Sequence, residues 1–226
     1  MPLTPLLARL RGGLVVSCQA YPGEPMRHPE TMAQVAQAAV RGGAVGLRAQ
    51  GLADIAVICE RVDVPVIGIW KVGDEGVFIT PTMRHAQAVL AAGADVVAID
   101  GTARRRPDRL TLTETVRGLH EEVGAVVMAD CDSFDAAMGA AEAGADLIGT
   151  TLAGYTGGRA RTDGPDLALL ESLVRALPEV PIIAEGRIHT PAQARAAHDV
   201  GAFAVVVGTA ITHPTTITRW FADALA

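Results

Sequence analysis

The segment at residues 92–99 reads AGADVVAI, and similar segments begin at Gly42, Ala143 and Val200. In each copy the glycine is expected to end a helix, because the residue after a helix often adopts a left-handed conformation that suits glycine. The apolar run that follows is typical of a buried parallel strand. Successive copies lie 50 to 57 residues apart, which leaves room for two βα units between them.

Further apolar runs alternate with these copies, at residues 14–16, 66–69, 125–128 and 181–184, so that eight strands are expected. The expected helix starts lie between these strands. Proline suits the first helical position, and the expected first residues are Pro29, Pro165, Pro191 and Pro214. Ser133 is expected to cap a fifth helix.

Eight alternating strands and helices with no linker between them predict one domain over residues 1–226, folded as a (β/α)8 TIM barrel of the α/β class. The structural alternative is an open doubly wound sheet. It is disfavoured because no Gly-x-Gly-x-x-Gly fingerprint follows any of the expected strands.

Composition narrows the range of possible functions and partners. The formal net charge of −6 argues against a nucleic-acid or anionic-membrane partner. The basic run at residues 104–106 is too short for a nucleic-acid groove and predicts a solvated loop or a local anion contact. Cys18, Cys59 and Cys131 lack metal-ligand spacing, so no metal is expected. No signal peptide or membrane-spanning segment is recognisable, which predicts a soluble cytoplasmic protein.

Lys71 is the only lysine in a chain with eighteen arginines. It follows the apolar run at residues 64–70, where a buried strand is expected to end. Arginine stays charged, whereas burial or a neighbouring positive charge readily lowers the pKa of a lysine. A single lysine at this place therefore suggests a neutral amine that carries a proton or acts as a nucleophile, although an ordinary lysine at a strand end remains the alternative.

The expected carboxyl ends of the strands converge on one mouth in a barrel of this kind, and chemistry gathers there. Beside Lys71, these ends carry Ser17, Gln19, Arg48, Asp100, Asp130, Thr150, Thr151, Glu185, Arg187 and Thr209. Gly186 and Gly208 follow strands seven and eight, the recurrent phosphate position of the fold, where backbone N–H groups can wrap an anion. Without a cofactor motif or metal ligands, Lys71, Glu185, Asp130 and Arg48 best suit proton transfer next to a carbonyl.

Several motifs then make a resemblance specific. The chain resembles N-acetylmannosamine-6-phosphate 2-epimerases from about Gly13 to the C-terminal helix, with the matching segments in the same order. They read VSCQA (16–20), GGAVGLRA (42–49), PVIGIWK (65–71), FITPT (78–82), MAD (128–130), TTLAGYT (150–156), AEGRI (184–188) and VGTAIT (207–212).

The resemblance implies a cofactor-independent barrel that interconverts N-acetylmannosamine 6-phosphate and N-acetylglucosamine 6-phosphate in sialic-acid breakdown, with a small sugar phosphate as partner and a homodimer as a possible assembly. By this resemblance the catalytic residues are Lys71 and Glu185. Sugar contacts map to Gln19, Arg48 and Asp130, and phosphate contacts map to Gly186, Gly208 and Thr209.

Two segments depart from the family pattern. After the lysine the family usually continues Arg-Asp-Tyr with a slightly longer loop, whereas residues 72–76 read VGDEG, so the wall beside Lys71 is expected to differ. The family's Ile-Thr-Arg-Pro near the phosphate reads ITHP at residues 211–214. Histidine titrates near neutral pH, which predicts a phosphate affinity that is lower or depends on pH.

The inferred reaction opens the sugar ring, removes the C2 proton beside the free C1 aldehyde and returns a proton to the opposite face. Lys71, made neutral by burial or by Arg48, is the expected base. Glu185 is expected to assist ring opening and to stabilise charge at O1 or O5, while Asp130 orients the sugar or Lys71. One base or two bases remain open.

Three alternatives also stay open. The first is a class I aldolase that forms a Schiff base on the single lysine. The second is an isomerase acting on another sugar phosphate. The third is a sugar-phosphate sensor without turnover, although such a sensor would have no reason to keep both Lys71 and Glu185.

Overall fold

The computed structural model describes residues 4–226 and contains a closed barrel of eight parallel strands in the order β1 to β8. The predicted TIM barrel is therefore confirmed, and the open-sheet alternative is wrong. The strands are β1 (Leu14–Cys18), β2 (Gly46–Gln50), β3 (Val66–Ile69), β4 (Val96–Asp100), β5 (Val126–Asp130), β6 (Leu147–Gly149), β7 (Ile182–Glu185) and β8 (Ala204–Val207).

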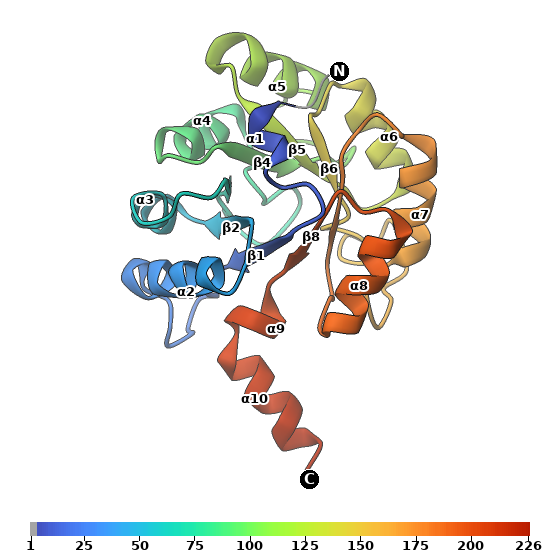
Figure 1. The fold of residues 1–226 in the computed structure, drawn as a ribbon. Helices are drawn as coiled ribbons and strands as arrows, with labels where there is room; N and C mark the ends of the chain where they lie inside the picture. The colour runs from blue at the N-terminus through green and yellow to red at the C-terminus, as the bar shows by residue number, and fades with distance from the viewer. Residues whose placement is uncertain (1–3) are drawn as a thin grey trace.

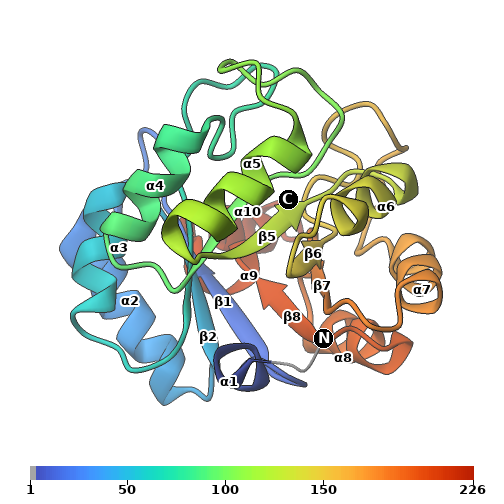
Figure 2. The same ribbon diagram turned by 90° about the horizontal axis from the view of Figure 1, so that it is seen from above.

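Helices surround the strands, and Figures 1 and 2 show α2 to α8 spaced around the outside of the barrel. They are α1 (Pro5–Ala8), α2 (Pro29–Arg41), α3 (Leu52–Cys59), α4 (Met83–Ala91), α5 (Leu112–Gly118), the π-helix η1 (Leu119–Val123), α6 (Phe134–Glu142), α7 (Leu167–Ala176), α8 (Pro191–Val200), α9 (Thr209–Thr212) and α10 (Pro214–Asp223).

The helix ends follow local sequence closely. The glycines of the four repeats, at positions 43, 93, 144 and 201, all have φ between 90° and 111°, a region that favours glycine. Ser133 caps α6 by accepting the amide of Ala136, as predicted. The expectation for Pro165 was wrong: α7 begins at Leu167, because the Asp166 carboxylate accepts the amide of Leu169 and caps the helix there.

The core has two parts. One lies between the strands and the outer helices, and the other fills the barrel itself. The inner part includes Val15, Ile67, Met128, Leu147 and Ile183, and Leu7 and Leu10 at the N-terminal end of the chain pack against it. Burial of each such side chain stabilises the fold by about 1.5–3 kcal/mol. The barrel is therefore packed inside, and its free space lies toward the carboxyl ends of the strands.

Strand alternation sends every second side chain into the barrel. Ser17, Asp130 and Glu185 have the inward parity, because they lie two residues beyond Val15, Met128 and Ile183 of the inner core. Arg48 has it as well, because it lies two residues beyond Gly46, where an added Cβ would meet Leu10 of the inner core at 2.5 Å. Helix α10 has no buried residue, and it extends away from the barrel in Figure 1. No helix within residues 4–226 has the length and apolarity needed to cross a membrane.

Candidate active site

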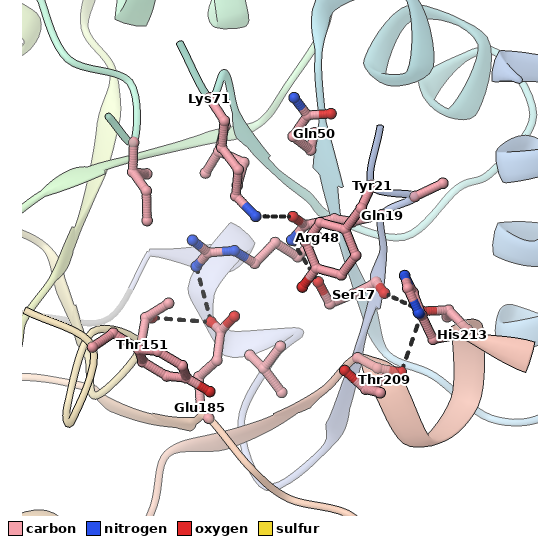
Figure 3. Close-up of a pocket in the computed structure, with 18 of the residues that line it drawn as sticks. Ser17, Gln19, Tyr21, Arg48, Gln50, Lys71, Thr151, Glu185, Thr209 and His213 are labelled. Atoms are coloured by element: carbon pink, nitrogen blue, oxygen red, sulfur yellow. Dashed lines mark hydrogen bonds and ion pairs between the residues drawn. The ribbon is translucent and has the colours of Figure 1, made fainter. Parts of the chain in front are cut away.

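A cavity of about 740 Å³ opens at the carboxyl ends of the strands. Its wall contains seven of the eight predicted site residues, namely Gln19, Arg48, Lys71, Glu185, Gly186, Gly208 and Thr209. Residues that are up to 190 positions apart in sequence thus face one space, and Figure 3 shows the labelled side chains directed into it. The predicted sugar contact Asp130 is the exception, because it does not belong to the wall.

Arg48 organises the floor of this cavity. Its side chain lies within β2, points into the barrel and is fully buried. Nη1 donates to Asp130 Oδ1 at 3.1 Å and to Glu185 Oε2 at 2.9 Å, and Nη2 donates to Asp130 Oδ2 at 2.5 Å. Burial alone would lower the pKa of Arg48, but the two carboxylates outweigh burial and raise it. One permanent cation therefore lies between two buried acids.

Asp130 lies behind Arg48. Its side chain is fully buried, and both carboxylate oxygens accept hydrogen bonds, from Arg48 and from the Thr151 hydroxyl at 2.6 Å. Asp130 therefore contacts Arg48 and Thr151, and its direct contact with the sugar stays a prediction. Gly149 makes room for this arrangement, because a Cβ at that position would lie 2.9 Å from Thr151 Oγ1.

Lys71 approaches the cavity from the other side, just after β3. Its Nζ donates to Gln19 Oε1 at 2.7 Å, and Gln19 Nε2 donates to Ser17 Oγ at 2.7 Å. Nζ also lies 5.4 Å from the centroid of the Tyr21 ring. Burial lowers the pKa of Lys71, and the charge of Arg48 lowers it further, from 10.5 to about 8. Both causes suggested by the sequence thus act on this amine.

The environment of Glu185 shifts its protonation in the opposite sense. Burial raises the pKa of this carboxyl, the Asp130 charge adds to the increase, and Arg48 opposes it. Oε2 accepts hydrogen bonds from Arg48 and, at 3.1 Å, from the Thr151 hydroxyl. The cavity thus joins an amine that loses its proton easily to a carboxyl that holds its proton more tightly than usual.

The turns after β7 and β8 form the far wall. Gly186 and Arg187 have φ values of 110° and 55°, so two successive residues are left-handed beside the glutamate. The Arg187 guanidinium turns away toward the β6–α7 loop, where it donates to the carbonyl oxygens of Ala153 and Gly164 and to the Thr162 hydroxyl. After β8, the Thr212 hydroxyl donates to the carbonyl of Ser17 at 2.8 Å and fixes the turn at Gly208.

Not every polar strand end faces the cavity. Asp100 at the end of β4 is fully buried and accepts hydrogen bonds from Thr102 and Arg104 outside the cavity wall. For the run at residues 104–106 a solvated loop or a local anion contact was predicted, and Arg104 makes such a contact with the Asp100 carboxylate at 2.6 Å. Arg105 is exposed, but Arg106 is buried and donates to the carbonyl of Asp100.

Sequence reasoning gave no role to several residues of the wall, among them Tyr21, Arg27, Gln50 and Tyr155. The only two tyrosines of the chain are Tyr21 and Tyr155, and both lie at this cavity. That scarcity is the same kind of signal as the single lysine. Arg27 and Gln50 carry no comparable signal. Within residues 4–226, no group of three or more His, Cys, Asp or Glu side chains could hold a metal ion.

Known proteins resemble this chain in sequence and fold. Residues 32–226 match the family described as "Putative N-acetylmannosamine-6-phosphate epimerase". The chain belongs to this family. A relative from Cutibacterium acnes, described as "Putative N-acetylmannosamine-6-phosphate 2-epimerase", is 66% identical over 221 residues. The match covers 97% of this chain and 96% of the relative. Another from Caldanaerobacter subterraneus is 48% identical over 219 residues, covering 96% and 92%.

A solved structure of the N-acetylmannosamine-6-phosphate 2-epimerase from Clostridium perfringens superimposes with a TM-score of 0.93. It is 38% identical and covers 98% of this chain and 96% of its own. The predicted membership of the epimerase family is confirmed by both kinds of similarity. Members of this family are isomerases, so the prediction of an enzyme of that class is also confirmed.

The two departures from the family pattern have clear places in the structure. Residues 72–76 form an exposed excursion between Lys71 and Val77, held at its base by the Val72 amide bonding to the carbonyl of Phe78. His213 lies at the junction of α9 and α10, and its ring belongs to the cavity wall near Gly208 and Thr209. The first departure forms an outer rim, and the second lies at the proposed phosphate end.

Proposed function

We propose that this protein interconverts N-acetylmannosamine 6-phosphate and N-acetylglucosamine 6-phosphate by removing and returning the proton at C2. The proposal rests on one observation: Lys71, Arg48 and Glu185 all line the same cavity, where Arg48 donates a hydrogen bond to Glu185. The family supports the substrate, because its members carry the name of this sugar phosphate. The expected pathway is the breakdown of sialic acid and other amino sugars.

Ring opening comes first, because the C2 hydrogen is acidic only when C1 is a free aldehyde. As the C1–O5 bond breaks, a protonated Glu185 donates its proton to the ring oxygen O5 and takes up the proton of the O1 hydroxyl, so that C1 becomes a free aldehyde. The raised pKa of Glu185 suits this role. Arg48, which is permanently charged, stabilises the oxyanion that forms when C2 loses its proton. Asp130 and Thr151 act indirectly, by holding Arg48 and Glu185 in place.

Lys71 is the C2 base. With a pKa of about 8, roughly one molecule in ten carries the neutral amine at pH 7, compared with about one in three thousand for a lysine at 10.5. Gln19 Oε1 accepts a hydrogen bond from the Lys71 amine and fixes its direction. The C2 proton passes to the Lys71 amine while the electron pair moves into the C1 carbonyl. A proton then returns to the opposite face of C2, either from the Lys71 ammonium after the open-chain sugar has rotated or from a second acid, and the C1 carbonyl forms again.

The 6-phosphate is expected to lie against the turns at Gly186, Gly208 and Thr209, which line the cavity beyond Glu185. A negatively charged phosphate receives charge-assisted hydrogen bonds there, which are about twice as strong as neutral ones. Unphosphorylated N-acetylmannosamine should therefore lose roughly two to four decades in kcat/KM.

The decisive experiment is an NMR assay with N-acetylmannosamine 6-phosphate in D2O, without added metal or nucleotide. The C2 epimer should form, deuterium should enter at C2, and EDTA should not inhibit. Absence of turnover would contradict the proposal. Equal efficiency on the unphosphorylated sugar would show that the phosphate site is elsewhere.

The class I aldolase remains a distinguishable alternative, since it also needs a lysine in a phosphate-binding barrel. Borohydride should trap substrate on Lys71 in an aldolase and leave the amine free in an epimerase. The family similarity supports the epimerase. A sensor without turnover would fail the NMR assay while still binding the sugar phosphate.

We also infer a homodimer. Helix α10 extends from the barrel, and its region exposes Trp220, Phe221 and Leu225, of which Phe221 is 69% and Leu225 is 90% exposed. Such side chains on a projecting helix and just after its end favour burial against a second copy. Light scattering should give twice the chain mass of 23.4 kDa. A cytoplasmic location and the absence of nucleic-acid and membrane partners stay predictions of the sequence.

A further inference from the structure

The two tyrosines of the chain, Tyr21 and Tyr155, have different neighbours at the mouth of the cavity. The Tyr21 ring lies beside the Lys71 amine, with Nζ 5.4 Å from the ring centroid. The Tyr155 ring lies beside two guanidinium groups instead, those of Arg161 at 5.4 Å and Arg187 at 5.1 Å. Both tyrosines are about half-exposed, at 50% and 52%. The aromatic neighbour of the proposed base is therefore Tyr21.

Contacts with the segment after β8 hold the Tyr21 ring in this place. The ring packs edge-on against the His213 ring, with the centroids 4.8 Å apart. The Tyr21 carbonyl accepts the Glu24 amide at 3.1 Å, which closes a turn, and the Glu24 carboxylate accepts the Thr215 hydroxyl at 2.6 Å. Figure 3 shows the Tyr21 side chain directed into the cavity between Lys71 and His213. The β1–α2 loop is thus tied to the start of α10, and the ring is held beside the amine.

A ring in this place acts on the amine in two opposite ways. It displaces water, which hydrates an ammonium group much more strongly than a neutral amine, so it favours the neutral form. Its π face attracts the ammonium and favours the charged form. That attraction is weak where the ring meets water, and half of Tyr21 is exposed. Burial is the largest cause of the lowered pKa of Lys71, so the displacement of water dominates.

We propose that Tyr21 is a positioning residue that acts through Lys71, because its ring excludes water from the amine and favours the neutral base. The inference rests on the proposed function, in which Lys71 removes the C2 proton, and it deepens that function. Tyr21 itself exchanges no proton with the sugar. Burial, and then Tyr155 and Glu185, raise the pKa of the Tyr21 phenol above its ordinary value of 10.0, so the phenol is uncharged where Lys71 titrates.

Other groups also act on the amine and must stay constant in a test. Arg48 from β2 lowers the pKa of Lys71, whereas Glu185 from β7 and Asp130 from β5 raise it. Substitution of Tyr21 leaves all three in place. It also leaves in place the remaining charged or titratable groups of the cavity wall, which are Arg27, Asp74, Tyr155, Arg187, His189 and His213.

The presence of one lysine permits a direct measurement, because protein labelled with ¹³C-lysine gives a single lysine signal in NMR. The midpoint of its shift between about pH 6 and about pH 11 reports the pKa of Lys71 without any substrate. The wild type is compared with Tyr21→Ala, which opens the amine to water, with Tyr21→Phe, which keeps the ring, and with Tyr21→Leu, which keeps an apolar cover without a π face. Tyr155→Ala is the matched control, and thermal unfolding checks the folding of every variant.

The midpoint of Tyr21→Ala should rise by about one pH unit, from about 8 toward 10.5, so that the neutral fraction at pH 7 falls about tenfold. The midpoints of Tyr21→Phe, Tyr21→Leu and Tyr155→Ala should stay within about 0.3 unit of the wild type. In the assay with N-acetylmannosamine 6-phosphate, the ascending limb of the kcat profile should move by the same amount in Tyr21→Ala.

An unchanged midpoint in folded Tyr21→Ala protein would overturn the inference and leave the proposed function intact. A lowered midpoint would do the same, since it would mean that the π face stabilises the ammonium. A rise of equal size in Tyr21→Phe, Tyr21→Leu or Tyr155→Ala would also overturn it, because the apolar cover over Lys71 would then not be the cause. If the midpoints move as expected but the wild type never turns over the sugar, the proposed function falls and the effect of Tyr21 on the amine stands.

Discussion

The two sides of the cavity are built differently. On the Lys71 side, the amine has one hydrogen bond, to Gln19, and the next five residues are exposed. On the Glu185 side, the carboxylate shares Arg48 with Asp130 and accepts from Thr151, and the turn that follows is tied down through Arg187. Figure 3 shows the two groups facing each other across the cavity.

This difference suits the two chemical tasks. A base works when it can be neutral, and few partners around Lys71 leave burial and Arg48 free to lower its pKa. An acid buried beside a second carboxylate must be compensated, and Arg48 with Thr151 supplies that compensation. The Lys71 side therefore contributes reactivity with little cost to the fold, whereas the Glu185 side couples activity to stability.

Replacement of the base should have the largest effect on activity. Lys71→Arg keeps the positive charge but removes the accessible neutral form, so kcat should fall by at least about 10² to 10⁴. The fold should survive, because Lys71 contributes little to core packing. The NMR assay gives kcat, and thermal unfolding is the control. Near-normal kcat in a folded Lys71→Arg protein would end the assignment of Lys71 as the base.

Two isosteric changes on the other side should separate chemistry from stability. Glu185→Gln removes the acid and should lower kcat by about 10² to 10⁴ with little change in Tm. Asp130→Asn removes the buried partner of Arg48 and should destabilise the fold by as much as about 3–5 kcal/mol, or roughly 10 °C in Tm. Calorimetry measures the Tm of the two variants, and the NMR assay measures their kcat. Equal Tm values for the two variants would contradict the described division of roles.

The pH dependence of kcat should report the base. Because the pKa of Lys71 is lowered to about 8, the amine is protonated below that value and neutral above it. Activity should therefore rise about tenfold per pH unit below pH 8 and level off above it. A profile of kcat from about pH 6 to about pH 10 checks this. An ascending limb of the kcat profile near pH 10.5 would mean that the cavity does not lower the pKa of Lys71.

A matched pair of glycine substitutions should have the smallest effects. Gly73, in the exposed segment after Lys71, has φ of 74° and no atom within 4 Å of an added Cβ, so Gly73→Ala should cost about 1 kcal/mol and leave kcat within about twofold. Gly186 has φ of 110°, farther from the left-handed region open to alanine, and it adjoins Glu185. Gly186→Ala should therefore lower kcat and stability more than Gly73→Ala. The same assays rank the two, and the reverse order would show that the Lys71 side is the more constrained.

Much of the fold could be predicted from local signals. The repeated glycines, the apolar runs and the capping residues act within a few positions, so eight strands and most helix starts follow from short stretches of chain. The start of α7 could not be predicted in this way. Pro165 suits the first position of a helix and Asp166 suits the cap before it, and the hydrogen bond from the Leu169 amide to the Asp166 carboxylate decides for the cap. The presence of only one lysine was enough to single out Lys71 as a candidate. Its neighbours in space could not be predicted, because they come from distant parts of the chain.

The sequence by itself determined the barrel, the family and seven residues of the cavity wall, because periodicity, caps and motifs are properties of neighbouring residues. Only the tertiary structure decided which polar strand ends face the ligand space. Asp100 turns to Thr102 and Arg104, and Asp130 lies behind Arg48. The physical reason is that Arg48 bonds to partners 82 and 137 residues away, and such pairings depend on which strands the closed barrel places opposite each other.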